Sequence, residues 1–158
     1  MDNSIGIDQE THKKLAVNLF NRTWDLIEKV NKSEDEKDEM MYSAIASRFH
    51  WGFVGTPLQF ARGEWQISRV YSLLGRHEPA FHHARKSLEF CIENNLGDFD
   101  LGFAYEALAR SYALIEVEEE SRRYIQLAQE AATKISNVEN REWLEKNIHS
   151  VETNSIPL

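Results

Sequence analysis

A spacing of 41 residues recurs along this chain and constrains its fold more than any other feature of the sequence. Helices are expected to begin near residues 57 and 98, and their partners near 77 and 118, so both pairs show this offset. Apolar and aromatic positions follow the same offset, as Ile67 and Leu108 and then Tyr71 and Tyr112 show. Periods in this range are typical of stacked helical hairpins.

Start and stop signals predict seven helices and almost no strand. Only three prolines and seven glycines occur in the chain. Ser33 with Glu36 and Ser136 with Glu139 have the spacing of capping boxes, in which each residue can satisfy an end donor of the other. The expected helices span residues 9–31, 34–52, 57–74, 77–94, 98–115, 118–134 and 137–150. The loops are short, so neighbouring helices are expected to be antiparallel.

The 158 residues fit one domain, expected over residues 8–151, with disordered ends at 1–7 and 152–158. No apolar stretch is long enough to span a membrane, and the N-terminus lacks the features of a signal peptide. Cys91 is the single cysteine, so no internal disulfide is possible and a cytoplasmic location is expected. The formal net charge of −8 argues against nucleic acid or an anionic membrane as a partner.

The segment WQISRVYSLLGRHEPAFHHARKSLEF, residues 65–90, resembles a tetratricopeptide repeat. The residues on the family's pattern are Ile67, Ser68, Tyr71, Gly75, Ala80, Ala84 and Leu88. A second segment, residues 108–128, fits less fully, because Glu116 replaces the glycine. The 41-residue period also exceeds the family's usual length of about 34 residues. The resemblance covers residues 57–134 well and 9–52 weakly.

The resemblance implies an all-α fold, a right-handed stack of about three antiparallel helical hairpins of the tetratricopeptide type with a C-terminal capping helix. Such a stack has a concave face, and members of the family mostly bind peptides or proteins. At about 100° per residue, Trp65 and Arg69 lie opposite Ile67 and Tyr71 on the third expected helix. In the resemblance, the side with Trp65 and Arg69 lines the concave groove.

Steps of 41 residues add the equivalent positions on the other helices. The candidate groove comprises Trp24, Glu28, Arg62, Trp65, Arg69, Phe103, Glu106 and Arg110. Arginine offers a planar fork of donors that suits carboxylates, and aromatic rings supply contact area at low entropy cost. An alternative for Arg69 is an internal ladder, in which Glu28 and Glu106 flank and neutralise it.

We expect a non-catalytic module that binds a protein or peptide through this groove. The alternative is a small-molecule sensor or an enzyme that uses the same groove as a pocket. An open trough would favour the peptide, and a closed pocket would favour the small ligand.

No catalytic, metal or cofactor site is expected. The sequence has no phosphate-binding loop, dinucleotide fingerprint or nucleophile elbow. His83 and Cys91 are too far apart along one helix to share an ion, and Asp100 is expected to lie in a solvated first turn. Trp143 on the last expected helix is a candidate homodimer contact.

Overall fold

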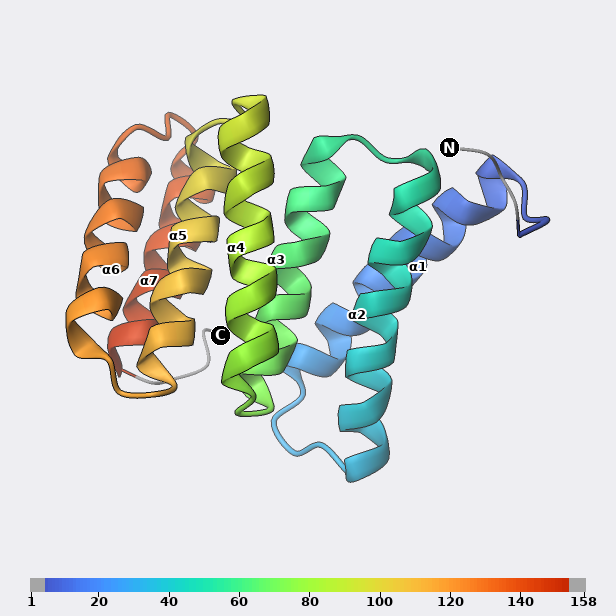
Figure 1. The fold of residues 1–158 in the computed structure, drawn as a ribbon, viewed down its shortest axis with the longest axis horizontal. Helices are drawn as coiled ribbons and strands as arrows, with labels where there is room; N and C mark the ends of the chain where they lie inside the picture. The colour runs from blue at the N-terminus through green and yellow to red at the C-terminus, as the bar shows by residue number, and fades with distance from the viewer. Residues whose placement is uncertain (1–4, 154–158) are drawn as a thin grey trace.

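The computed structural model describes residues 5–153, and this part of the chain contains seven α-helices and no strand (Figure 1). The helices are α1 (Gln9–Glu28), α2 (Glu34–Val54), α3 (Pro57–Leu73), α4 (His77–Asn94), α5 (Asp98–Ala113), α6 (Glu118–Thr133) and α7 (Val138–Thr153). The all-α class and the sequence of helices agree with the prediction, with small differences at the ends. None of the described helices is both long and apolar enough to cross a membrane.

The helix ends show which local signals act. Ser33 caps α2 as predicted: the Glu36 amide donates to its hydroxyl at 3.2 Å, and the Glu36 carboxylate accepts from the Ser33 amide at 2.8 Å. At α7 the cap is Asn137 rather than Ser136, because its side-chain oxygen accepts from the Asn140 amide at 2.9 Å. The disorder predicted for residues 1–4 and 154–158 lies outside the described residues. Residues 152 and 153 belong to α7, although the prediction placed them beyond its end.

Adjacent helices pack as pairs, α1 with α2, α3 with α4, and α5 with α6. Figure 1 shows these pairs following one another from α1 and α2 on the right to α5, α6 and α7 on the left. The first helices of the pairs also meet, α1 with α3 and α3 with α5, and α7 packs against both α5 and α6.

Two pairs share an equivalent contact 41 residues apart. The Ser68 hydroxyl on α3 donates to the carbonyl of Ala80 on α4 at 2.7 Å. The Ser121 hydroxyl on α6 donates to the carbonyl of Ala109 on α5 at 2.9 Å. Serine and alanine have exchanged places between the two pairs, but each pair keeps one small hydroxyl at a close helix crossing. The sequence offset therefore corresponds to an offset between equivalent packing sites.

Helix α3 contributes to two apolar cores. On one side Ile67 and Val70 pack with residues of α1 and α2, such as Leu26 and Met40. On the other side Trp65 joins a cluster with α4 to α7, whose members are Trp65, Ala84, Phe103, Ala107, Leu108, Ala128, Ala132, Ile135, Leu144 and Ile148. The sequence placed Trp65 on an open groove. Instead it is only 7% exposed, because α5 packs against that side of α3 and side chains of α7 belong to the same cluster.

Candidate functional site

Side chains of the first and last helices meet beside α3, on the side that the sequence expects to be open. The ring centroid of Trp24 on α1 lies 6.3 Å from that of Trp143 on α7 and 5.5 Å from that of Trp65 on α3. Trp143, which the sequence suggested as a homodimer contact, therefore packs inward. The homodimer stays a prediction without that support.

A cavity of about 180 Å³ lies beside these rings. It is lined by Phe20, Trp24, Ala61, Arg62, Trp65, Ser87, Phe99, Asp100, Phe103 and Trp143, which we call the aromatic pocket. Edge-to-face contacts fix its walls, since Phe103 lies 5.3 Å from Trp65 and 5.0 Å from Phe99 between ring centroids. An apolar cavity of about 150 Å³ is large enough to bind benzene. The aromatic pocket therefore suits a single aromatic or large aliphatic group.

An ion pair marks the polar edge of the aromatic pocket. The Arg62 guanidinium donates to both oxygens of Asp100, at 2.7 and 3.2 Å. The Arg62 side chain is 48% exposed, whereas that of Asp100 is 9% exposed. The expectation that Asp100 lies in a solvated first turn is wrong, because the contact between α3 and α5 places it against Arg62. Both oxygens of this carboxylate are therefore engaged.

A second cavity adjoins the aromatic pocket. It measures about 190 Å³ and is lined by Val17, Phe20, Asn21, Trp51, Gln59 and Arg62. Phe20 and Arg62 belong to the walls of both cavities. The two cavities thus form a row along α1 and α3, with these two side chains between them.

Trp65 is held by a buried carboxylate. Its indole Nε1 donates to Glu106 Oε2 at 3.0 Å. The other oxygen of Glu106 accepts from Arg110 Nε at 2.8 Å. Glu106 is 1% exposed and Arg110 is 9% exposed. This chain of bonds orients one wall of the aromatic pocket.

Arg110 also fastens α5 to α7. Its Nη2 donates to the Asn147 carbonyl at 3.1 Å and to the Ser150 hydroxyl at 2.6 Å. Arg110 therefore has a structural role, with a carboxylate on its own helix bonded to Nε and two acceptors on α7 bonded to Nη2. The prediction that it contacts a ligand stays untested.

Arg69 has no such partners. It is 4% exposed, yet it forms no hydrogen bond or ion pair with any residue between 5 and 153. The pKa of Arg69 is lowered to about 10, first by burial and then by the charge of Arg110, while the charge of Glu106 partly opposes both effects. The alternative ladder is not formed in the described part of the chain. Glu28 is exposed, and the Glu106 carboxylate binds Trp65 and Arg110 instead.

The structure thus divides the eight predicted groove residues. Trp24, Arg62, Trp65 and Phe103 line the aromatic pocket. Glu106 accepts hydrogen bonds from both Trp65 and Arg110. Arg69 is buried without a partner in the described chain, and Glu28 is exposed.

Sequence reasoning missed Phe20, Phe99 and Trp143 as lining residues. Phe99 lies four residues before Phe103, so helical spacing could have placed it on the same face. Nothing local in the sequence could have placed Trp143, because its position depends on how α7 crosses α5.

A buried polar cluster lies outside the aromatic pocket. Glu64 accepts hydrogen bonds from His83 Nδ1 at 2.5 Å and from Arg48 Nε at 3.2 Å. Burial raises the pKa of Glu64, but the bond from His83 and the charges of His83 and Arg48 outweigh it, and the net shift is downward. These bonds join α2, α3 and α4.

A histidine pair joins α1 and α2. The Nδ1 atoms of His12 and His50 lie 2.8 Å apart, and the ring of His12 stacks on that of Phe53 at 4.1 Å. Burial lowers the pKa of His50, and the charge of His12 lowers it further. Within residues 5–153, no three histidine, cysteine or acidic side chains are grouped as a metal site.

No protein-family model, curated protein or solved structure matches this chain. The aromatic pocket and the buried charges around Trp65 are therefore the basis for a functional proposal.

Proposed function

We propose that this protein is a non-catalytic interaction module that binds a peptide segment of a protein partner. One large apolar side chain of the peptide would enter the aromatic pocket. The observation that carries the proposal is a cavity of about 180 Å³ walled by six aromatic rings, with the half-exposed Arg62 at its edge. Interfaces commonly concentrate their binding energy in a few anchors that fill such pockets.

The architecture supports this proposal. Three helix pairs followed by α7, with equivalent contacts 41 residues apart, suit a right-handed stack of the tetratricopeptide type whose last helix is a cap. Repeat stacks of this kind present an extended surface along their first helices. The single cysteine, Cys91, is buried and suits a reducing compartment such as the cytoplasm.

The second cavity favours a peptide over a compact ligand. Because Phe20 and Arg62 belong to both cavities, a chain that fills the aromatic pocket can continue past them. The guanidinium of Arg62 would then meet the polar backbone or an acidic side chain of the peptide. An extended peptide rises about 3.3 Å per residue and points successive side chains to opposite faces, so side chains two residues apart can occupy the two cavities.

A small-molecule sensor is the second candidate, and one observation favours it. The contact between Trp24 and Trp143 closes the groove over α3, and the remaining volume suits a single-ring compound. A sensor would bind such a compound in the aromatic pocket alone. The two candidates differ in whether the second cavity contributes to affinity.

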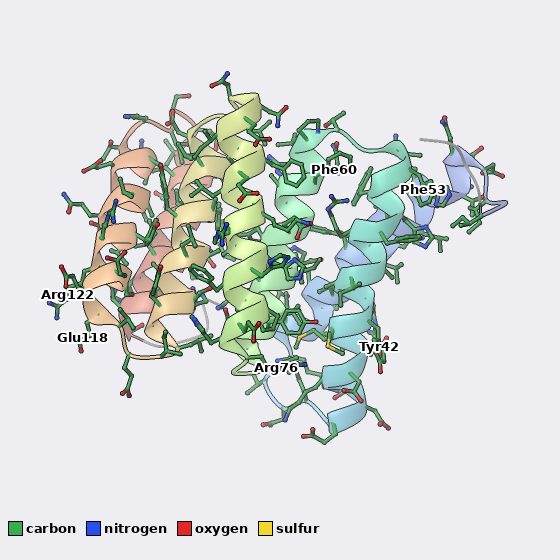
Figure 2. The ribbon with its side chains drawn as sticks, in the orientation of Figure 1. Tyr42, Phe53, Phe60, Arg76, Glu118 and Arg122 are labelled. Carbon is green, nitrogen blue, oxygen red and sulfur yellow. The ribbon has the colours of Figure 1, made fainter. Side chains whose placement is uncertain are left out.

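Selection from a random-peptide phage library tests the proposal, followed by measurement of Kd for the selected peptides. Trp24→Ala removes one wall of the aromatic pocket and should weaken binding by about 2 kcal/mol, roughly thirtyfold. Tyr42→Ala is the matched control, because Tyr42 is 63% exposed on the outer side of α2 (Figure 2). It should leave Kd unchanged.

Gln59→Ala then separates the two candidates, since Gln59 lines only the second cavity. For a peptide that spans both cavities, this change should also weaken binding. Selected peptides that bind Trp24→Ala as tightly as the wild-type protein would contradict the proposed site.

A further inference from the structure

We infer that Arg69 is an anion subsite, which binds the carboxylate of the same ligand whose apolar group fills the aromatic pocket. This inference rests on the proposed function and names the chemical class of ligand: an aromatic or large aliphatic group next to a carboxylate. Its basis is a guanidinium that is almost fully buried and has no partner among residues 5–153.

A buried charge without a partner is costly, and proteins ordinarily pair it. The positive charges near Arg69 add to that cost, and one carboxylate reduces it in part. Arg110 repels it, and Arg69 in turn acts as a like charge on Lys32. The one carboxylate that opposes these effects is Glu106, whose two oxygens are already bonded. The region therefore has an excess of positive charge in a chain whose net charge is −8.

The guanidinium keeps a narrow contact with solvent. The fully buried side-chain atoms without a partner in the described chain are Gln66 Oε1 and Ser72 Oγ, and no nitrogen of Arg69 is among them. The small remaining exposure of Arg69 thus includes its guanidinium. Ser72 lies three residues further along α3, within about 60° of Arg69 around the helix axis, and its hydroxyl is a spare donor.

The spacing along α3 suits a compact ligand. Arg69 follows Trp65 by four residues, which is about 6 Å along the helix axis. An amino-acid residue spans a similar length from its ring to its carboxylate. A carboxylate also fits the planar fork of an arginine in a bidentate pair, and such charge-assisted bonds are among the strongest hydrogen bonds in proteins.

The test compares N-acetyl-phenylalanine with N-acetyl-phenylalaninamide, which differ only in the carboxylate. Titrations followed by NMR at the Trp65 Nε1–H signal would give the Kd of each probe. The wild-type protein should bind the acid at least about tenfold more tightly than the amide, as charge-assisted hydrogen bonds typically allow. Arg69→Met should abolish this preference while the affinity for the amide persists.

Arg122→Met is the matched control, because Arg122 lies on α6 at the far edge of the molecule (Figure 2) and its side chain is 78% exposed. It should keep the wild-type preference for the acid. Arg69→Lys keeps a cation without the planar fork and should reduce the preference only in part.

Three outcomes would count against the inference, and they differ in what they leave standing. Equal binding of both probes by the wild-type protein, or a preference that survives in Arg69→Met, would overturn the anion subsite and leave the aromatic pocket intact. Failure of both probes to shift the Trp65 signal would count against the pocket as well. Where Arg69→Met does not fold, Arg69→Lys takes its place, because Arg62 at the edge of the aromatic pocket is unchanged in that variant. A full wild-type preference for the acid in Arg69→Lys would then overturn the anion subsite.

Discussion

Arg69 and Arg110 occupy equivalent positions, 41 residues apart on α3 and α5, yet their surroundings differ completely. Arg110 has Glu106 one turn before it and two acceptors on α7. Arg69 has Trp65 at the position that corresponds to Glu106. Its neighbour α5 supplies Glu106 to Trp65 and Arg110. The charge of Arg110 is therefore neutralised by a neighbouring carboxylate, whereas the charge of Arg69 has no bonded counter-charge in the described chain.

This difference assigns the two arginines different roles: Arg110 contributes to stability, and Arg69 is the one proposed to bind a ligand. The 41-residue offset reproduces the position of an arginine, but the residue one turn before it decides whether the guanidinium is neutralised within the helix. At the end closed by α7, the buried charges join two helices. On α3, one helical turn beyond Trp65, the buried charge has no structural partner in the described chain and is available to a ligand.

The largest expected effect is that of Arg110→Met. This change leaves the Glu106 carboxylate buried without its cation and removes the bonds to α7, so the free energy of unfolding should fall by about 3–5 kcal/mol. Urea denaturation of the variant and of Arg122→Met, as an exposed control, would measure it. A loss similar to that of the control would mean that the α7 end is not held by its charges.

A core truncation gives the next effect. Leu108→Ala should destabilise by about 2–5 kcal/mol, because Leu108 is 1% exposed within the core around α5. Tyr71→Ala should cost less, since Tyr71 is only partly buried in the core shared with α1 and α2. Denaturant midpoints in the opposite order would show that the α1–α2 end, not the α7 end, contains the tighter core.

Gly102→Ala tests how closely α7 approaches α5. A Cβ atom at Gly102 would clash with Leu144 Cδ2, so overpacking should cost about 1–2 kcal/mol after the gain in helix propensity. The equivalent position on α3 is Ala61, which has a Cβ atom and is buried. Gly52→Ala is the control, because its nearest contact would be 3.7 Å away, and it should be neutral or stabilising. Thermal unfolding of both variants measures the contrast.

The α1–α2 end should respond to mild acid. Burial and the charge of His12 lower the pKa of His50 in the folded protein below 6.5. At pH values between this lowered pKa and 6.5, the unfolded chain therefore binds more protons at His50 than the folded protein does. Stability should therefore be lost as the pH falls below 6.5. The effect should stay under about 1 kcal/mol, because the half-buried ring keeps some hydration. Comparison of His50→Asn with the wild-type protein at pH 7.5 and 5.5 isolates this contribution, and equal pH dependence would contradict it.

The smallest expected change in stability is that of Arg69→Met, and its sign is opposite to that of Arg110→Met. Removal of an uncompensated buried charge should leave the free energy of unfolding unchanged or raise it by about 1 kcal/mol. Urea denaturation measures this directly. A loss of several kcal/mol would break the comparison, because it would make Arg69 a structural residue like Arg110.

Much of the architecture was predictable because its signals are local or periodic. The capping box at Ser33 and the 41-residue offset predicted where helices begin and which of them form pairs. The same offset selected Trp24, Trp65 and Phe103, three of the rings that line the aromatic pocket.

The bonding of the charges could not be predicted in this way. The pair of Arg62 with Asp100 spans 38 residues, and the bonds of Arg110 to α7 depend on the angle at which α7 crosses α5. Helical periodicity gives the direction of a side chain from its own axis, but it does not say which neighbouring helix lies there. The sequence therefore could not show that α5 packs at Trp65, which is only 7% exposed.

The contact between Trp24 and Trp143 also bears on when the aromatic pocket forms. Trp24 belongs to α1 and Trp143 to α7, so an emerging chain cannot complete the pocket until α7 has been synthesised and folded. A partner that recognises the pocket would thus distinguish a chain in which α7 has folded from one in which it has not. A partner that binds only the folded pocket would also stabilise the packing of α7 by mass action. Its binding would therefore protect both α1 and α7 against unfolding.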